Sequence, residues 1–411
     1  MKSIINEITN EKIWDEYLEF KRQQLSMPQY ELNELEEYVK SKKYKNIAKK
    51  IVEGKYQFSI PEKHLINKIN KSKKRVVYTF NYDENMILKI ISYLFSKKYD
   101  KKYSDNCYSF RKKYTVKDAI KKLTKAKNIN NLYGYKVDIE NYFNSVDVDI
   151  IMEKFKLFIE DDDDLYNLIK NILKDNRVKF NNEIINEKKG IMAGVPISSF
   201  LANIYIQEID EYFKEEKILY ARYSDDIIFF TDKVNLEMYI KKLNDMLQIN
   251  KLSLNKDKIK YINSNEKWDF LGFSYHDGVI DLSDIAKKKI KGKIKRASKK
   301  LRRWMIKKDA NYERAIKAVI KKFNKKFYEA KNKNDLTWSL WYFPIINTSD
   351  GLHEIDLYMQ DCLRYIKTGK YNKKNYNLRY EQLKKLGYKP LVSEYYKLLE
   401  EKRLTNAKNM L

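Results

Sequence analysis

The chain has 411 residues, which is enough for a large core and two or three packed subdomains and excludes a short disulfide-stapled module. Its 84 Lys and Arg against 57 Asp and Glu give a formal charge of +27, which favours a polyanionic partner such as nucleic acid, although biased coding composition would also enrich Lys. Two cysteines and three histidines, all scattered, argue against a zinc site or a disulfide framework.

The N-terminal part is predicted to be helical, because apolar residues recur at helical spacing from about residue 10 to residue 52. A strand from Arg75 to Phe80 then leads into a helix that starts near Asp83. The first residues lack the apolar run of a signal peptide, and no stretch approaches the ~20 apolar residues of a membrane span. We therefore expect a soluble, cytoplasmic protein without a membrane partner.

The middle third alternates between strands and helices, which indicates an α+β fold with an antiparallel sheet backed by helices. The predicted elements are a strand at 132–139, a helix at 147–159, a hairpin turning at Asn181-Asn182, a helix from about 198 to 213 capped by Ser198 or Ser199, two strands flanking Asp225-Asp226, a helix at 234–249 and a hairpin turning at Asp277-Gly278. The acidic run at 160–164 is expected to be a solvated loop.

After residue 282 the chain is predicted to be almost wholly helical, and residues 284–308 are very basic. A basic run in a helix is most often a solvated face. Beside a polymerase-like middle part, it favours a helix that grips nucleic acid.

Two adjacent carboxylates stand in "YSDDIIFF", where Asp225 and Asp226 interrupt an otherwise apolar segment. Burying either charge without a partner costs several kcal/mol. A bound Mg²⁺ removes that conflict, because it takes carboxylate oxygens and substrate phosphates as ligands. An ordinary polar hairpin turn is the alternative, so the question is whether a third carboxylate exists.

Asp138 in "GYKVDIENYFNSV" is the candidate third carboxylate, since it ends an apolar strand. The alternative for Asp138 is a cap on the following helix. The segments around Asp138 and around Asp225-Asp226 resemble the first and third palm motifs of reverse transcriptases. Between them "GIMAGVPISSFLANIYI" resembles the second motif, "LSLNKDKI" resembles the fourth, "FLGF" resembles the primer-grip turn, and "DNCYSFRKKYTVKDAI" is similar to a fingers segment of bacterial enzymes.

This resemblance implies a right-hand polymerase: fingers with N-terminal helices at 1–133, an antiparallel-sheet palm at 134–275, and a helical thumb with a C-terminal extension at 276–411. It also implies two Mg²⁺ ions. Asp138 and Asp225 would bridge the ions, Asp226 would support the ion nearest the primer, and the carbonyl of Ile139 would complete the other. Lys258 matches the lysine of the fourth motif and is the candidate proton donor to pyrophosphate.

The family places an aromatic against the sugar at the position of Phe143, where a bulky ring leaves no room for a 2′-hydroxyl. The alternative is a core aromatic. Gly194 and Pro196 fit a tight turn at the incoming base pair. Ala193 replaces the family's usual Gln, and Ser199 replaces a Pro, which puts ordinary template use in doubt. Other candidates for gripping triphosphate or template are Lys74, Arg75 and Arg111.

The C-terminal segment resembles the helical extension of bacterial defence-associated reverse transcriptases, which are related to group II intron and retron enzymes. That implies an anti-phage role with an associated noncoding RNA as template or scaffold, dNTPs as substrates and DNA as product. A homo-oligomer is the candidate assembly. Two alternatives stay open: DNA synthesis that is template-independent or protein-primed, and a noncatalytic RNA-binding scaffold.

Overall fold

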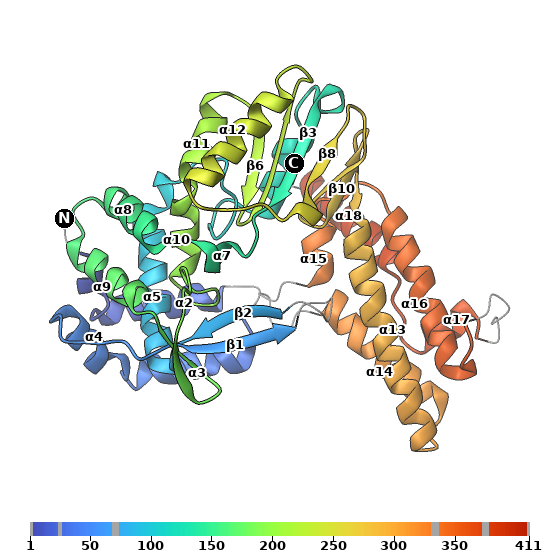
Figure 1. Ribbon diagram of the computed structural model, residues 1–411. Helices are drawn as coiled ribbons and strands as arrows, with labels where there is room; N and C mark the ends of the chain where they lie inside the picture. The colour runs from blue at the N-terminus through green and yellow to red at the C-terminus, as the bar shows by residue number, and fades with distance from the viewer. Residues whose placement is uncertain (1–2, 24–26, 68–73, 330–336, 372–377, 409–411) are drawn as a thin grey trace. The chain divides into compact units, whose positions relative to one another are not determined.

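The computed structural model describes residues 3–23, 27–67, 74–329, 337–371 and 378–408. Packing divides the chain into two compact units, with the boundary between Asn265 and Glu266 (Figure 1). The finer division into fingers, palm and thumb at residues 133 and 275 stays a prediction.

The N-terminal unit begins with helices and continues as alternating strands and helices (Figure 1). Its helices are α1 (Ile4–Glu7), α2 (Glu11–Arg22), α3 (Gln29–Lys40), α4 (Tyr44–Val52), α5 (Tyr82–Tyr99), α6 (Val116–Thr124), α7 (Tyr142–Ser145), α8 (Val148–Ile159), α9 (Asp163–Lys174), α10 (Ser198–Tyr205), α11 (Gln207–Glu215) and α12 (Leu236–Ile249). Its strands are β1 (Glu62–Asn67), β2 (Lys74–Thr79), β3 (Tyr133–Asp138), β4 (Arg177–Phe180), β5 (Glu183–Asn186), β6 (Leu219–Tyr223), β7 (Asp226–Thr231) and β8 (Lys260–Ile262).

The central sheet of this unit has the strand order β6-β7-β3-β8, and every neighbouring pair is antiparallel. Strand β7 carries the apolar run "DIIFFT", in which every residue after Asp226 is buried. Burial of consecutive residues means that both faces of the strand are covered. Helix α11 packs against β6, and α12 packs against β3.

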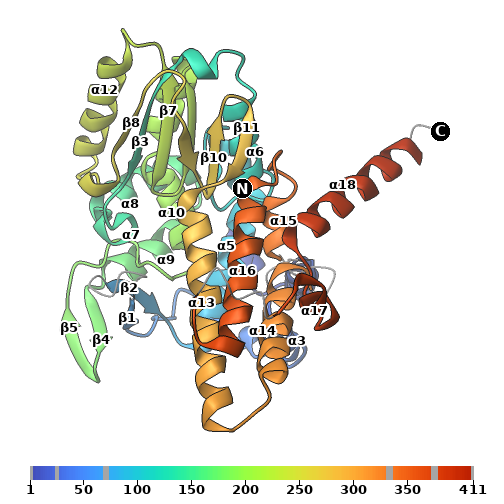
Figure 2. The same cartoon turned by 90° about the vertical axis from the view of Figure 1, so that its right-hand side faces the viewer.

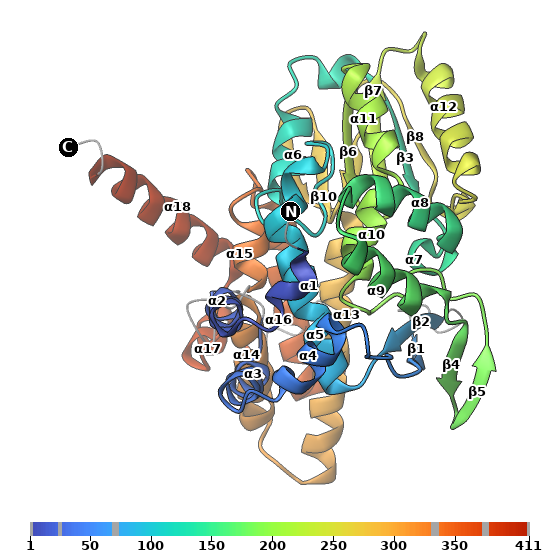
Figure 3. The ribbon, with the colours of Figure 1, turned by 90° about the vertical axis from the view of Figure 1, so that its left-hand side faces the viewer.

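A second sheet of the same unit has the order β2-β1-β4-β5. Strands β4 and β5 form a hairpin whose turn residues Asn181 and Asn182 have φ of 51° and 68°, as a two-residue type I′ turn requires. The hairpin projects from the body of the unit (Figures 2 and 3). The predicted hairpin at these residues is confirmed.

The C-terminal unit combines a small sheet, β11-β10-β9, with helices. Its elements are β9 (Trp268–Phe270), β10 (Phe273–His276), β11 (Val279–Leu282), α13 (Asp284–Lys307), α14 (Tyr312–Phe327), α15 (Trp338–Tyr342), α16 (Asp350–Thr368), α17 (Tyr380–Lys385) and α18 (Leu391–Lys408). Helices α13, α14 and α16 pack on one another, and α18 starts against α16 and then extends away (Figure 2). The predicted helical character after residue 282 is confirmed.

The predicted α+β class is confirmed, but two local expectations were wrong. Neither Ser198 nor Ser199 caps α10, because Ser198 is buried and its hydroxyl donates to the carbonyls of Ile191 and Met192 instead. The acidic run is not wholly solvated: Asp162 is buried and accepts hydrogen bonds from the amides of Ile4 (3.1 Å) and Leu165 (3.2 Å). Asp162 thereby caps α9 and anchors α1.

Among the described helices, none combines the length and the apolar content that crossing a bilayer requires.

Candidate active site

The three predicted aspartates come together at one end of the central sheet. Asp138 is the last residue of β3, and it stands opposite Asp226, the first residue of β7. The two residues between β6 and β7 are Ser224 and Asp225, and Ser224 has a φ of 59°. A positive φ at the first turn residue is typical of a tight hairpin turn. This turn lets adjacent aspartates serve one site, and ligand oxygens of all three residues lie within 4.8 Å of one another.

Backbone hydrogen bonds join the segments that carry the three aspartates to one another and to the loop after α12. The amide of Ile139 donates to the carbonyl of Asp225 (3.0 Å), so the β6–β7 turn is tied directly to the end of β3. On the other side, the amide of Asn255 donates to the carbonyl of Asp138 (2.8 Å). The cluster therefore sits on hydrogen-bonded strand ends, as a preorganised site requires.

The electrostatics of the cluster fit a bound cation. Burial, and then the charge of Asp138, raises the pKa of Asp225. Burial, and then the charges of Asp225 and Asp138, raises the pKa of Asp226 to about 6. Both shifts mean that the folded protein disfavours a full set of negative charges in this place. Divalent cations with oxygen ligands relieve that repulsion, so the donor set fits Mg²⁺.

One basic side chain contacts the cluster, and a second one influences it through its charge. The Lys258 Nζ stands 2.5 Å from Oδ1 of Asp138, although more than half of the lysine side chain is exposed. The charge of Arg75 lowers the pKa of Asp225 against the larger effects that raise it, which places Arg75 within electrostatic range. Lys258 thus offsets part of the negative charge of the cluster.

Magnesium is expected to raise the melting temperature at pH 7.5 by about 5 °C or more at saturation, and the gain should shrink as the pH falls below about 6. The reason is that the raised pKa of Asp226 lets protons compete with the cation. A carboxyl whose folded pKa is raised destabilises the fold when ionised, and that cost disappears as the pH falls through the folded pKa.

Thermal melting at pH 7.5, 6 and 5, with and without Mg²⁺, measures this effect. Asp226→Asn is the control, because it removes the titrating group and should show a smaller gain with less dependence on pH. A gain in the wild type that is equal at all three pH values would contradict the assignment.

A buried ion pair contacts the β6–β7 turn, and the sequence analysis did not identify it. Arg222 on β6 and Asp210 on α11 have fully buried side chains, and the guanidinium binds the carboxylate through Nε (2.7 Å) and a terminal nitrogen (2.5 Å). The Tyr220 hydroxyl donates to the same carboxylate (2.9 Å). A second terminal nitrogen of Arg222 donates to the carbonyl of Ser224 (3.4 Å), so this pair braces the turn.

The remaining donors of Arg222 reach neighbouring elements, so the pair is well satisfied. They bond to the Asn203 side chain (3.3 Å) and carbonyl (3.4 Å) and to the Cys107 sulfur (3.2 Å). Burial raises the pKa of the Cys107 thiol, which keeps that group neutral. One sequence signal for this ion pair was available: Arg222 lies within the apolar strand "YARY". An arginine that is buried in a strand requires an acidic partner.

Phe143 and the loop at 190–197 lie next to each other. The amide of Ile191 donates to the carbonyl of Phe143 (2.9 Å). The Phe143 ring is half-buried and meets Phe110 edge-to-face at 6.1 Å.

Gly194 has a φ of +101°, and a Cβ there would lie 3.0 Å from the carbonyl of Tyr78, so this position requires glycine. Ala193 is half-buried, Pro196 is half-buried, and the Ser199 hydroxyl donates to the Pro196 carbonyl (3.0 Å).

The predicted fingers residues differ in their surroundings. Lys74 and Arg75 are exposed at the start of β2. Arg111 is buried and bonded within the protein, and its predicted grip on triphosphate or template stays a prediction. Its guanidinium donates to Asp100 (3.1 Å) and to the carbonyls of Ser104 (2.6 Å) and Cys107 (3.1 Å), and it stacks on the Tyr114 ring at 3.7 Å. These bonds give Arg111 a structural role in folding its loop.

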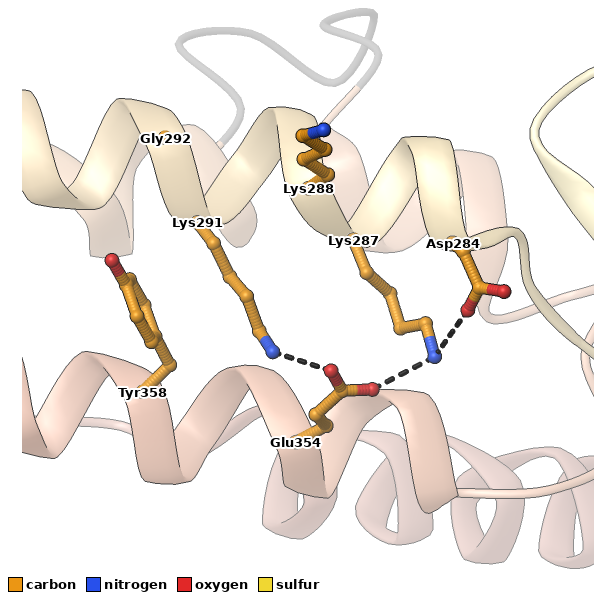
Figure 4. A pocket seen from close by; sticks show the side chains of 7 residues that line it. All are labelled: Asp284, Lys287, Lys288, Lys291, Gly292, Glu354 and Tyr358. Atoms are coloured by element: carbon orange, nitrogen blue, oxygen red, sulfur yellow. Dashed lines mark hydrogen bonds and ion pairs between the residues drawn. The ribbon is translucent and has the colours of Figure 1, made fainter.

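The C-terminal unit has a separate charged cavity of about 330 Å³ between α13 and α16 (Figure 4). Glu354 on α16 reaches between two lysines of α13: it pairs with Lys287 at 2.8 Å and with Lys291. Lys287 also pairs with Asp284 (2.9 Å), and the Lys291 Nζ lies 5.4 Å from the centre of the Tyr358 ring. The acidic residues therefore neutralise this end of the basic helix, and its grip on nucleic acid stays a prediction.

Comparison with known proteins gives a family match to "Reverse transcriptase (RNA-dependent DNA polymerase)" over residues 60–275. The retron Ec83 reverse transcriptase of Escherichia coli is 32% identical over 112 residues, which are 25% of this chain and 34% of that protein. The match thus spans about a third of the length of this curated relative.

Solved structures with similarity include two telomerases. Apo telomerase from Candida tropicalis, truncated from its C-terminal domain, is 19% identical with a TM-score of 0.41, and 55% of each chain is covered. Telomerase from Candida albicans with a TWJ fragment of telomeric RNA is 14% identical with a TM-score of 0.45, and 88% of this chain and 70% of that chain are covered.

Proposed function

We propose that this chain, which belongs to the reverse transcriptase (RNA-dependent DNA polymerase) family, copies RNA into DNA at the cluster of Asp138, Asp225 and Asp226. The family match covers more than half of the chain and includes all three residues. The observation that carries the proposal is the meeting of the three carboxylates at the paired ends of β3 and β7. A noncatalytic scaffold has no need for a buried cluster of like charges.

Nucleotide addition is an in-line phosphoryl transfer from the triphosphate to a primer 3′-oxygen. Asp138 and Asp225 are the residues that would hold both divalent ions, with Asp226 and the Ile139 carbonyl in support. Such ions, when bound, supply positive charge to the attacking oxygen and to the leaving pyrophosphate. The chain's own contribution is to keep the carboxylates fixed on strand ends and to present the Lys258 ammonium, which carries protons next to Asp138.

Phe143→Ala is expected to raise incorporation of ribonucleotides relative to deoxyribonucleotides by about tenfold or more, because the smaller side chain admits a 2′-hydroxyl. Primer extension with each nucleotide class measures the ratio of their kcat/KM values. Phe158→Ala is the control, since Phe158 is a half-buried aromatic on α8 that stacks on Phe95. An unchanged ratio in Phe143→Ala would make Phe143 a packing residue only.

The biological setting that we propose is anti-phage defence, with an associated noncoding RNA as template or scaffold. The support is the resemblance of the C-terminal helices to those of defence-associated enzymes, the partial similarity to a retron reverse transcriptase and the formal charge of +27. Two divalent ions, dNTPs as substrates and DNA as product belong to the same proposal.

The test is to purify the full chain with its copurifying nucleic acid, supply dNTPs and Mg²⁺, and sequence both the bound RNA and any new DNA. RNA with complementary DNA supports the proposal. DNA unrelated to bound RNA would replace it with untemplated or protein-primed synthesis, for which Ala193 in place of Gln leaves room. No DNA at all would favour a noncatalytic scaffold.

A further inference from the structure

Asn144 is a polar side chain that connects three segments around the proposed nucleotide pocket. It follows Phe143 on α7, and its Oδ1 accepts a hydrogen bond from the amide of Ala193 (3.0 Å). Its Nδ2 donates to the carbonyl of Val76 on β2 (3.2 Å). One amide group therefore joins the helix that carries Phe143 to the loop and to the strand.

Backbone contacts also hold the loop at 190–193 against β2 and α7. The carbonyl of Ala193 accepts from the amide of Tyr78 (2.8 Å), so both main-chain groups of residue 193 are held. A Cβ at Gly190 would lie 2.4 Å from the carbonyl of Phe143, so the loop backbone passes directly against α7. Asn144 and β2 therefore fix residue 193, while Phe143 and Ser198 hold the neighbouring residues 191 and 192.

Bonding to the Ala193 amide and to the Val76 carbonyl requires a side chain at position 144 with one acceptor and one donor close together. Asn provides both from one rigid amide. Ala would leave the amide of Ala193 and the carbonyl of Val76 without these partners, and Asp would keep an acceptor but turn an oxygen toward the Val76 carbonyl. The loss of these two hydrogen bonds frees the loop around residue 193 to move.

We propose that Asn144 is a positioning residue for the deoxynucleoside triphosphate: it sets the spacing between β2, the loop at 190–194 and the Phe143 ring. Asn144 acts through Ala193 and Val76 and does not contact the substrate. This inference rests on the proposed function. It also assigns a role to the altered second motif, because residue 193 acts through its main chain, which alanine supplies as well as glutamine.

The test is steady-state primer extension with Asn144→Ala, Asn144→Asp and the wild-type full chain. We expect the KM for dNTP to rise about tenfold in Asn144→Ala, with kcat changed less than about threefold, and the preference for dNTP over rNTP to fall. Asn144→Asp should show the same direction. Ser145→Ala is the control on the same helix, because the Ser145 hydroxyl donates only to the Glu140 carbonyl (3.2 Å) among the bonds described, away from the loop.

The outcomes separate the inference from the proposed function. An unchanged KM and unchanged sugar preference in Asn144→Ala, with active wild type, would overturn the inference alone. No synthesis by the wild type would overturn the proposed function, and amide hydrogen exchange then decides the inference. Faster exchange of the Ala193 amide in Asn144→Ala than in Ser145→Ala would support the positioning role of Asn144. Equal exchange in the two variants would overturn it. Melting temperatures of all variants identify any general loss of folding.

Discussion

Asp225→Asn is expected to lower DNA synthesis by at least about 1,000-fold while leaving the melting temperature of the metal-free protein unchanged or higher. The two effects have one physical cause. The carboxylate stands in a cluster that repels it, and burial and Asp138 raise its pKa, so its charge costs stability in the absence of cations. A neutral amide of the same shape relieves that cost and removes a ligand for the ions.

Primer extension with Mg²⁺ and a melting curve without Mg²⁺ measure both quantities on the same preparation. Asp161→Asn is the matched control, because Asp161 is exposed between α8 and α9 and outside the cluster, and it should change neither. Substantial extension by Asp225→Asn would show that the cluster is not the catalytic centre. A large drop in melting temperature would show that the aspartate has a structural role instead.

Asp210→Ala is expected to reduce the free energy of unfolding of the N-terminal unit by about 3–5 kcal/mol, because it leaves the Arg222 guanidinium buried without its carboxylate. The Tyr220 hydroxyl loses its acceptor in the same variant. Denaturant unfolding measures the change. Since Arg222 also bonds to the carbonyl of Ser224, we expect DNA synthesis to fall at temperatures where the variant is still folded.

The double variant Asp210→Leu, Arg222→Met separates the cost of an orphaned charge from the value of the pair. Apolar side chains of similar size in place of a buried ion pair are often neutral for stability. The double variant should therefore be more stable than Asp210→Ala. Any loss of DNA synthesis in the double variant then reflects the lost hydrogen bond from Arg222 to the carbonyl of Ser224. If Asp210→Ala unfolds like the wild type, the pair contributes little and this account is wrong.

Local sequence signals were sufficient for much of the fold. The turn at Asn181-Asn182, the two strands around Asp225 and Asp226, and the helices at both ends follow from hydrophobic periodicity and from residues that tolerate positive φ. The meeting of Asp138 with Asp226 follows once β3 and β7 pair in register. The sequence supplied the strands, and the family resemblance supplied their pairing.

The rest depended on which way side chains face, which motif matching does not determine. Arg111 lies in a segment that matches the family, yet its guanidinium turns inward to Asp100 and two carbonyls. Asp210 and Arg222 are 12 residues apart on a helix and a strand, so their contact is a result of packing. Asn144 was missed for the same reason, because both of its partners are main-chain groups on distant segments.

Helix α13 carries many positive charges that repel one another along its length. Lys291 and Lys295 lie one turn apart, as do Lys299 and Arg303, and like charges at this spacing weaken a helix by about 0.2–0.5 kcal/mol per pair. Among the residues that the structure describes, Asp284 and Glu354 offset this self-repulsion near the start of the helix. Small counterions offset it further along, and they screen over about 8 Å at physiological ionic strength. A polyanion lying along α13 would displace those ions and strengthen the helix at the same time.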